Sequence, residues 1–258
     1  MKVIKADLSD KLEYVELIPL ADLHYGDKNC NLDFLKEKIE YIKNTENAYC
    51  VLNGDIIDNA LRQSVGDIYS QEENPMKQLE SIINLFKPIK DKILAVTLGN
   101  HEYRTWKFDG IDLVKMICIT LGIESRYAKE SALLFLRFGN QGSHHSNLPQ
   151  SYTIFMCHGS GGGRKEGAKA IRLANMSTIV DADIYIHSHT HLPMIMKQAF
   201  HRVSRSNSSI KLVTKLFVNT SSMLNYGGYG EMYEFKPNAI DTPHIFLHGK
   251  DFKYEAKL

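Results

Sequence analysis

The sequence has no long apolar run and almost no net charge. No stretch approaches the roughly 18 consecutive apolar residues that a membrane span needs, and residues 1–7 contain no apolar signal core. The net charge of +1 over 258 residues predicts no general attraction to nucleic acid or to a membrane surface. We therefore expect no membrane partner, and any polyanion must bind to a local basic surface.

Cysteine is also scarce. The chain has four cysteines, which are widely scattered and form no Cys-x-x-Cys pair: Cys30, Cys50, Cys118 and Cys157. Cys50 and Cys157 lie inside apolar runs, where cysteine usually behaves as a small buried hydrophobe. We therefore predict reduced cysteines and a cytoplasmic location.

Internal repeats, low-complexity segments and linker-like changes of composition are absent as well. A length of 258 residues is ample for a large core, and 43% hydrophobic and 24% charged residues are ordinary values for a globular protein. A single domain over residues 1–258 is the expectation.

What the sequence does contain is a set of short apolar runs that end abruptly in polar residues. Residues 93–98 predict a strand buried on both faces, and Gly99-Asn100-His101-Glu102 follows at once. Ligands bind at the carboxyl ends of parallel strands in α/β sheets, so polar groups at such ends indicate a site. Four other runs, at residues 17–21, 49–53, 153–157 and 184–186, are followed by Asp22 and His24, Asp55 and Asp58, His158, and His189 and His191.

The remaining periodicity predicts an α/β protein. Apolar residues at helical spacing predict helices over residues 31–43, 74–87 and 111–121, and their alternation with strands indicates a largely parallel sheet. The polar loop at residues 59–74 is long enough to suggest a lid. Later in the chain we expect strands at residues 133–138 and 151–157, a basic helix after Gly163, a hairpin of residues 194–203 and 210–218, and strands at 232–235 and 245–247.

The polar residues at the strand ends are suited to binding metal ions. Mixed carboxylate, imidazole and amide donors favour Mn, Fe, Zn or Ni over Ca or Mg alone. Seven donors exceed what one ion normally takes, and two ions about 3.5–4 Å apart stabilise both the entering and the leaving oxygen of a phosphoryl displacement. The candidate ligands are Asp22, His24, Asp55, Asn100, His158, His189 and His191.

The order of these motifs resembles the calcineurin-like metallophosphoesterase superfamily. The motifs are Asp-x-His, Gly-Asp-x-x-Asp, Gly-Asn-His-Glu, His-Gly and x-His-x-His, from Asp22 to His191, and the stretch at residues 219–222 resembles the family's ending. The resemblance implies an α/β fold with two mixed β-sheets packed as a sandwich with flanking helices, in four layers αββα.

The resemblance also implies a role for each motif residue. Asp22, His24 and His191 would hold one ion and Asn100, His158 and His189 the other, with Asp55 bridging. His101 would protonate the leaving oxygen or steady the transition state, and Asp58 would orient His101. A hydroxide between two divalent ions would be the nucleophile, and Mn is the first choice for these ions.

Two positions depart from the family pattern. Ser188 stands where the last motif usually has glycine, and Asn59 stands where the protein serine/threonine phosphatases carry a phosphate-clamping arginine. Arg62 or Arg104 would be a substitute clamp. Arg164 and Lys165 form part of a basic face that either grips an anionic substrate or is only solvated.

These features favour a metal-dependent phosphoesterase that acts on a phosphodiester, with nucleic acid or a nucleotide as the substrate class. A basic hairpin supports this preference, through Arg202, Arg205, Lys211 and Lys215. The main alternative is a phosphomonoesterase acting on a small molecule or a phosphoprotein. Two more distant alternatives are a mononuclear amide hydrolase and a non-catalytic binding module.

Three further histidines have no assigned role. His187 is either a histidine satisfied in the core or a further donor beside His189, because alternation along a strand places both on one face. His144 and His145 are more typical of a loop than of a ligand set.

Overall fold

A computed structural model describes residues 1–64, 68–141 and 148–258. It contains two six-stranded sheets, both mixed. The first has the order β12 (Tyr254–Lys257), β11 (His244–His248), β2 (Tyr14–Leu20), β3 (Ala48–Asn53), β4 (Ile93–Thr97) and β5 (Tyr127–Ala128). The second has the order β1 (Lys2–Asp7), β6 (Ser131–Phe138), β7 (Gln150–Cys157), β8 (Ile184–His187), β10 (Ser209–Asn219) and β9 (Met194–Ser204).

The two sheets pack face to face around a common apolar core. Val15, Leu17 and Ala95 of the first sheet share a buried cluster with Leu134 and Ile184 of the second. Strands β2, β3 and β4 run parallel to each other, and β7, β8 and β10 do the same in the second sheet. Because all five residues of β4 are buried, the strand is the continuous apolar run typical of a sheet covered on both faces.

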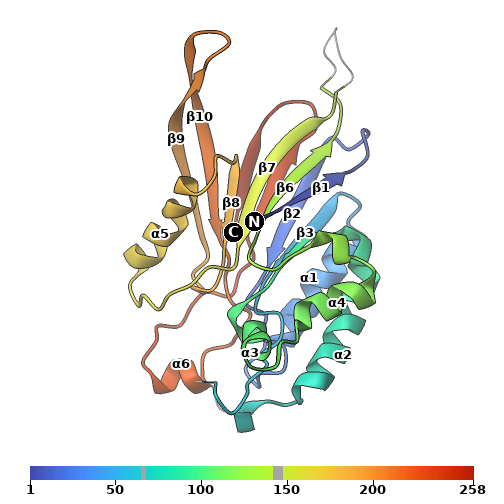
Figure 1. Ribbon diagram of the computed structural model, residues 1–258, viewed down its shortest axis with the longest axis vertical. Helices are drawn as coiled ribbons and strands as arrows, with labels where there is room; N and C mark the ends of the chain where they lie inside the picture. The colour runs from blue at the N-terminus through green and yellow to red at the C-terminus, as the bar shows by residue number, and fades with distance from the viewer. Residues whose placement is uncertain (65–67, 142–147) are drawn as a thin grey trace.

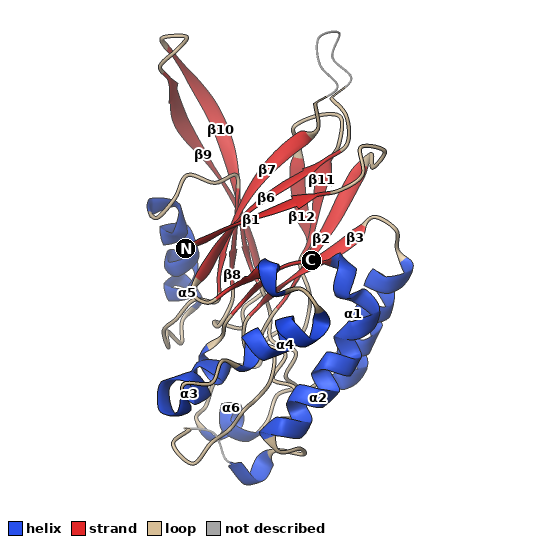
Figure 2. Ribbon diagram, turned by 45° about the vertical axis from the view of Figure 1, so that its right-hand side comes forward, coloured by secondary structure: helices blue, strands red, loops and turns tan. Residues whose placement is uncertain are grey.

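Helices cover the outer face of each sheet (Figure 2). On the first sheet lie α1 (Leu32–Asn44), α2 (Pro75–Phe86) and α4 (Leu113–Leu121), which form a second core with that sheet. On the second sheet, α5 (Glu166–Asn175) packs Leu173 against Phe155, Tyr185 and Phe217. The layers are therefore αββα, which confirms the expected fold class.

The helix ends follow simple local rules. The Asn31 and Asn74 side chains cap α1 and α2 by accepting from the N–H three residues on, and Pro75 occupies the first turn of α2. Gly122 ends α4 in the left-handed conformation, with a φ of 73°. Short 3-10 turns lie at Ile68–Ser70, Lys87–Lys92, Glu124–Arg126 and Met176–Thr178.

Several sequence expectations for single elements were wrong. No strand forms at residues 232–235, because α6 (Gly228–Met232) ends there and the chain turns, with the Phe235 N–H bonded to the Gly230 carbonyl. The basic residues Arg164 and Lys165 precede α5 instead of lying on it. Strands β1, β5 and β12 and the helix α3 (Asn100–Asp109) were not expected.

The four cysteines are free thiols, as expected. Burial raises the pKa of Cys50 to about 12, so this thiol is protonated and unreactive. None of the helices in the described part of the chain is long and apolar enough to cross a membrane.

Candidate metal centre

The carboxyl ends of strands from both sheets meet at one edge of the sandwich, at the lower end of the molecule in Figure 1, near α3. The loops after β2, β3 and β4 carry donors from the first sheet, and those after β7 and β8 carry donors from the second. The structure brings all seven predicted donors together there, in two adjacent clusters.

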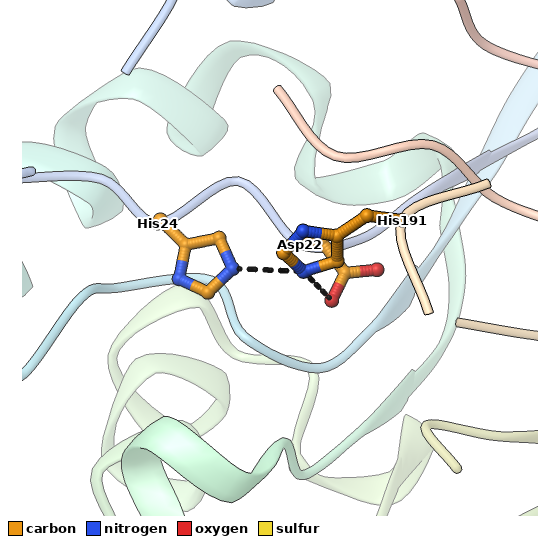
Figure 3. Close-up of side chains that lie close together, drawn as sticks. All are labelled: Asp22, His24 and His191. Carbon is orange, nitrogen blue, oxygen red and sulfur yellow. Dashed lines mark hydrogen bonds and ion pairs between the residues drawn. The ribbon is translucent and has the colours of Figure 1, made fainter. Parts of the chain in front are cut away.

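The first cluster consists of Asp22, His24 and His191 (Figure 3). The Nε2 atoms of His24 and His191 point toward each other and lie 3.4 Å apart. His191 Nε2 also lies 3.3 Å from Asp22 Oδ1. Asp22 is fully buried, and its Oδ1 accepts no hydrogen bond from the described residues. A buried carboxylate oxygen left in this state is typical of a metal ligand.

The second cluster consists of Asp55, His158, His189 and Asn100. His158 Nε2 lies 3.2 Å from Asp55 Oδ2 and 3.0 Å from Asn100 Oδ1. The same nitrogen is 4.0 Å from Asp22 Oδ1, so the two clusters are neighbours. His158 Nδ1 faces the Asn53 carbonyl at 2.8 Å. Since a carbonyl only accepts, Nδ1 carries the proton, and the lone pair of a neutral His158 is on Nε2, inside the cluster.

These distances fit ligand sets of metal ions. Atoms about 2.1 Å from one ion lie about 3.0 to 3.4 Å from each other in octahedral or tetrahedral coordination. Four separations within the two clusters, from 3.0 to 3.4 Å, match that spacing. The donor set, and an Asp22 Oδ1 that accepts no hydrogen bond from the described residues, therefore fit divalent cations.

The carboxylates of the clusters are suited to cation binding, whereas His158 would have to lose a proton before it could bind an ion. Burial acts to raise the pKa of Asp55, but His158 and His101 outweigh burial and hold the pKa of this carboxyl well below its usual range. Burial acts to lower the pKa of His158, but Asp55 outweighs it and raises this pKa to about 10. Burial and then the charge of His158 lower the pKa of His189 to about 4. The carboxylates are therefore ionised, as metal ligands must be.

A histidine–carboxylate pair lies beside the clusters. His101 Nδ1 is 2.6 Å from the Asp58 carbonyl oxygen and 3.3 Å from Asp58 Oδ1. Its Nε2 is directed to the second cluster, 3.9 Å from Asp55 Oδ2. Hydrogen bonds from His101 and His24 overcome burial and lower the pKa of Asp58. His24, Asp58 and His101 are also close enough to form a third group of potential ligands.

Comparison with known proteins identifies the family of this chain. The calcineurin-like phosphoesterase model matches residues 18–193, a range that includes both clusters and the His101–Asp58 pair. The chain belongs to the calcineurin-like phosphoesterase family. Membership of this family supports a hydrolase of phosphate esters. No curated protein matches the chain.

Solved structures of similar proteins come from several organisms. A predicted phosphoesterase from Streptococcus pneumoniae TIGR4 is 13% identical, with coverage of 95% of this chain and 90% of that one and a TM-score of 0.40. A metallophosphoesterase from Sphaerobacter thermophilus is 12% identical, with coverage of 93% and 90% and a TM-score of 0.39. Zinc-complexed Vps29 from Entamoeba histolytica is 11% identical, with coverage of 94% and 98% and a TM-score of 0.40.

Two residues that support the site of this calcineurin-like phosphoesterase were not identified from the sequence. Glu102 is fully buried, and its carboxylate accepts from the N–H groups of Ile56 (2.5 Å), Ile57 (3.0 Å) and Gly99 (3.2 Å). It therefore fixes the turn that presents Asp55. The second, Ser188, accepts a 2.7 Å hydrogen bond from Asn53 Nδ2, so the residue that replaces glycine also ties β3 to the loop after β8.

The basic residues predicted to contact the substrate lie at different distances from the two clusters. Arg104 is near the pair, with Nη1 3.5 Å from the Asp58 carbonyl oxygen. Arg62, Arg164 and Lys165 are exposed, and no hydrogen bond or ion pair among the described residues joins them to either cluster. Arg164 instead stacks on Phe235, 5.0 Å from the ring centre.

The unassigned histidines have different outcomes. His187 is buried and hydrogen-bonded through Nδ1 to Asn219 Oδ1 at 2.8 Å, as a satisfied core histidine would be. Its ring also explains the glycine of the His-Gly motif, because a Cβ on Gly159 would lie 2.3 Å from His187 Nε2. His144 and His145 lie outside the described residues.

Proposed function

We propose that this chain hydrolyses phosphate esters with two bound divalent metal ions. Asp22, His24 and His191 would hold the first ion, Asn100, His158 and His189 would hold the second, and Asp55 would contribute to both. Manganese is our first choice, and iron, zinc and nickel suit the same donors. The observation that carries the proposal is the adjacency of the two clusters, with 4.0 Å between His158 Nε2 and Asp22 Oδ1, an oxygen that accepts no hydrogen bond from the described residues.

Divalent ions held by these residues would supply Lewis acidity toward the phosphoryl oxygens and toward an attacking water. The residues of the chain handle the leaving group. His101 donates a proton from Nε2 to the leaving oxygen, and Asp58 holds the ring through Nδ1, which is 3.3 Å from its Oδ1. Burial acts to lower the pKa of His101, but Asp55 and Asp58 raise it, which favours the protonated form that a general acid needs.

We favour phosphodiesters as substrates, with phosphomonoesters as the alternative. A diester carries less charge than a monoester and has an alkoxide leaving group, which His101 would protonate. The hairpin of β9 and β10 adds less support than the sequence suggests, because Asp181 forms ion pairs with both Arg202 and Lys215. Of the four basic residues predicted for the hairpin, only Arg205 and Lys211 are both exposed and without an ion pair to another described residue.

Arg104 is the substrate contact that we propose for the phosphoryl group itself. It lies near the carboxylates of Asp55 and Asp58 but forms no ion pair with a carboxylate in the described part of the chain, so its N–H groups remain available to an anion. Arg62, Arg164 and Lys165 are proposed only as contacts for parts of the substrate beyond that group, because they are exposed.

The test is turnover of bis-p-nitrophenyl phosphate against p-nitrophenyl phosphate under the same Mn²⁺ concentration. We expect faster turnover of the diester, and a raised KM for Arg104→Gln with no change for the matched variant Lys107→Gln on the exposed side of α3. Preference for the monoester, with no cleavage of DNA or RNA, would favour the phosphatase alternative. Turnover of neither ester would contradict the proposal and favour a binding module.

A further inference from the structure

Asn59 is fully buried between the loop after β3 and the first turn of α3. Its side-chain Nδ2 donates to the His101 carbonyl oxygen at 2.8 Å and to Thr105 Oγ1 at 2.9 Å. Its backbone N–H donates to Gln78 Oε1 at 2.9 Å. The carboxamide is therefore turned toward α3, at the position where one branch of the family has a substrate-binding arginine.

Consecutive residues thus hold His101 at two points. The carbonyl oxygen of Asp58 holds the imidazole by accepting a 2.6 Å hydrogen bond from Nδ1. Asn59 holds the backbone carbonyl of the same histidine by donating to it from Nδ2. Because a carbonyl oxygen only accepts, Nδ1 carries the proton of that contact. The Nε2 of the ring held in this way is directed to the second cluster, 3.9 Å from Asp55 Oδ2.

The backbone conformation of Asn59 indicates that its contact with α3 is a specific feature of the fold. Its φ of 44° is left-handed, a conformation that asparagine adopts more readily than most residues but still at a cost. Two hydrogen bonds to α3 and one to Gln78 offset that cost. The left-handed turn allows the residue directly after Asp58 to reach α3 with its side chain.

We propose that Asn59 is a positioning residue for His101, which keeps the imidazole on Asp58 and its Nε2 aimed at the leaving oxygen. This inference rests on the proposed function, in which His101 is the general acid. Asn59 itself contacts no reacting atom. Its loss therefore affects proton donation more than substrate or metal binding.

The variant that isolates this role is Asn59→Gly. Glycine adopts a φ of 44° without strain, so the backbone and its bond to Gln78 remain while the carboxamide is removed. Gln71→Ala is the matched control. Gln71 anchors the same loop by accepting from the Ala60 N–H at 2.9 Å, and none of its hydrogen bonds reaches α3.

The first measurement compares a p-nitrophenyl diester with the corresponding phenyl diester, whose leaving group needs protonation more. For Asn59→Gly we expect kcat on the phenyl ester to fall by on the order of tenfold to a hundredfold more than on the p-nitrophenyl ester. KM and metal content should not change, and Gln71→Ala should not discriminate between the esters. An equal loss on both esters, as a smaller folded fraction would give, would overturn the proposal.

The second measurement does not depend on activity. The hydrogen-bonded Nδ1 proton of His101 should give a downfield proton NMR signal, assigned by its absence in His101→Ala. We expect this signal to be lost or broadened in Asn59→Gly and kept in Gln71→Ala. Its persistence in Asn59→Gly would overturn the inference. A wild-type chain that hydrolyses neither ester would contradict the proposed function instead, and the NMR signal would still decide the role of Asn59.

Discussion

Backbone strain at single residues is concentrated in the metal-binding loops. Six of the eight non-glycine residues with positive φ in the described chain belong to them: Asp22, His24, Asp55, Asn59, His189 and His191. Such a conformation costs about 1–3 kcal/mol per residue in the general case. Aspartate, asparagine and histidine tolerate it better than other residues. The residue types that suit metal binding therefore also suit the sharp turns that present them.

A residue-scale prediction concerns His101. His101→Ala should keep both metal ions and the fold but lose about 10²–10⁴-fold in turnover, because general acid catalysis typically contributes that much. Elemental analysis and kcat check this prediction on the same sample. His201→Ala, on the exposed part of β9, is the control and should leave both values unchanged.

The opposite result has a defined meaning. If an ion is lost together with turnover, His101 is a ligand in the third group with His24 and Asp58, and its assignment as an acid is wrong.

At the scale of elements, burial decides what the sequence reveals. Strands β2, β3, β4, β7 and β8 could be predicted because they are short apolar runs in the middle of their sheets. The edge strands β1, β5 and β12 are short or partly exposed, and their sequences lack that signal. Helix α3 buries only Glu102, so it has no apolar stripe from which to predict it.

The residues of the candidate site could be predicted from the sequence, but the local geometry of the loops that carry them could not. The metal donors stand at strand ends, which the sequence shows directly. The conformation of Asp22 and His24 could not be predicted, because both leave the strand for a left-handed turn, with φ values of 51° and 47°. The roles of Glu102, Asn59 and Ser188 could not be read from the sequence, because their partners belong to other elements.

An element-scale prediction concerns the contact between the loops after β3 and β4. A Cβ on Gly99 would lie 2.0 Å from the Asp55 backbone nitrogen, so Gly99→Ala must push these loops apart. We expect a loss of about 1–3 kcal/mol in the free energy of unfolding, as overpacking typically gives, together with loss of metal and turnover.

Gly122→Ala provides the matched control. Gly122 has a φ of 73° and open space around its Cβ position, so this change strains only the end of α4. We expect a similar loss of about 1–2 kcal/mol with metal content and specific activity retained. Denaturant unfolding and elemental analysis of the two variants separate the effects, and a Gly99→Ala protein with full metal content would contradict the prediction.

At the scale of the whole molecule, each metal cluster joins the two sheets. The first takes Asp22 and His24 from the sheet of β2 and His191 from the loop after β8, and the second combines Asp55 and Asn100 with His158 and His189. Ions bound there would connect the two halves of the sandwich. They would therefore stabilise the packing of the sheets in addition to supplying the proposed chemistry.

We predict one cooperative thermal transition for the single domain of residues 1–258, with a Tm that rises with Mn²⁺. An ion at 100 times its Kd stabilises by about 2.7 kcal/mol per site, and each kcal/mol raises Tm by about 2–4 °C at this size. Differential scanning calorimetry with and without a chelator measures the shift. Asp55→Ala should lose most of it, and two separate transitions would contradict the single domain.

The most direct test of the dinuclear phosphoesterase is a titration of Mn²⁺ into chelator-treated protein, followed by hydrolysis of bis-p-nitrophenyl phosphate. We predict no turnover without the ion and a rate that saturates at two ions per chain. Saturation at one ion per chain, or a rate that does not depend on metal, would contradict the account.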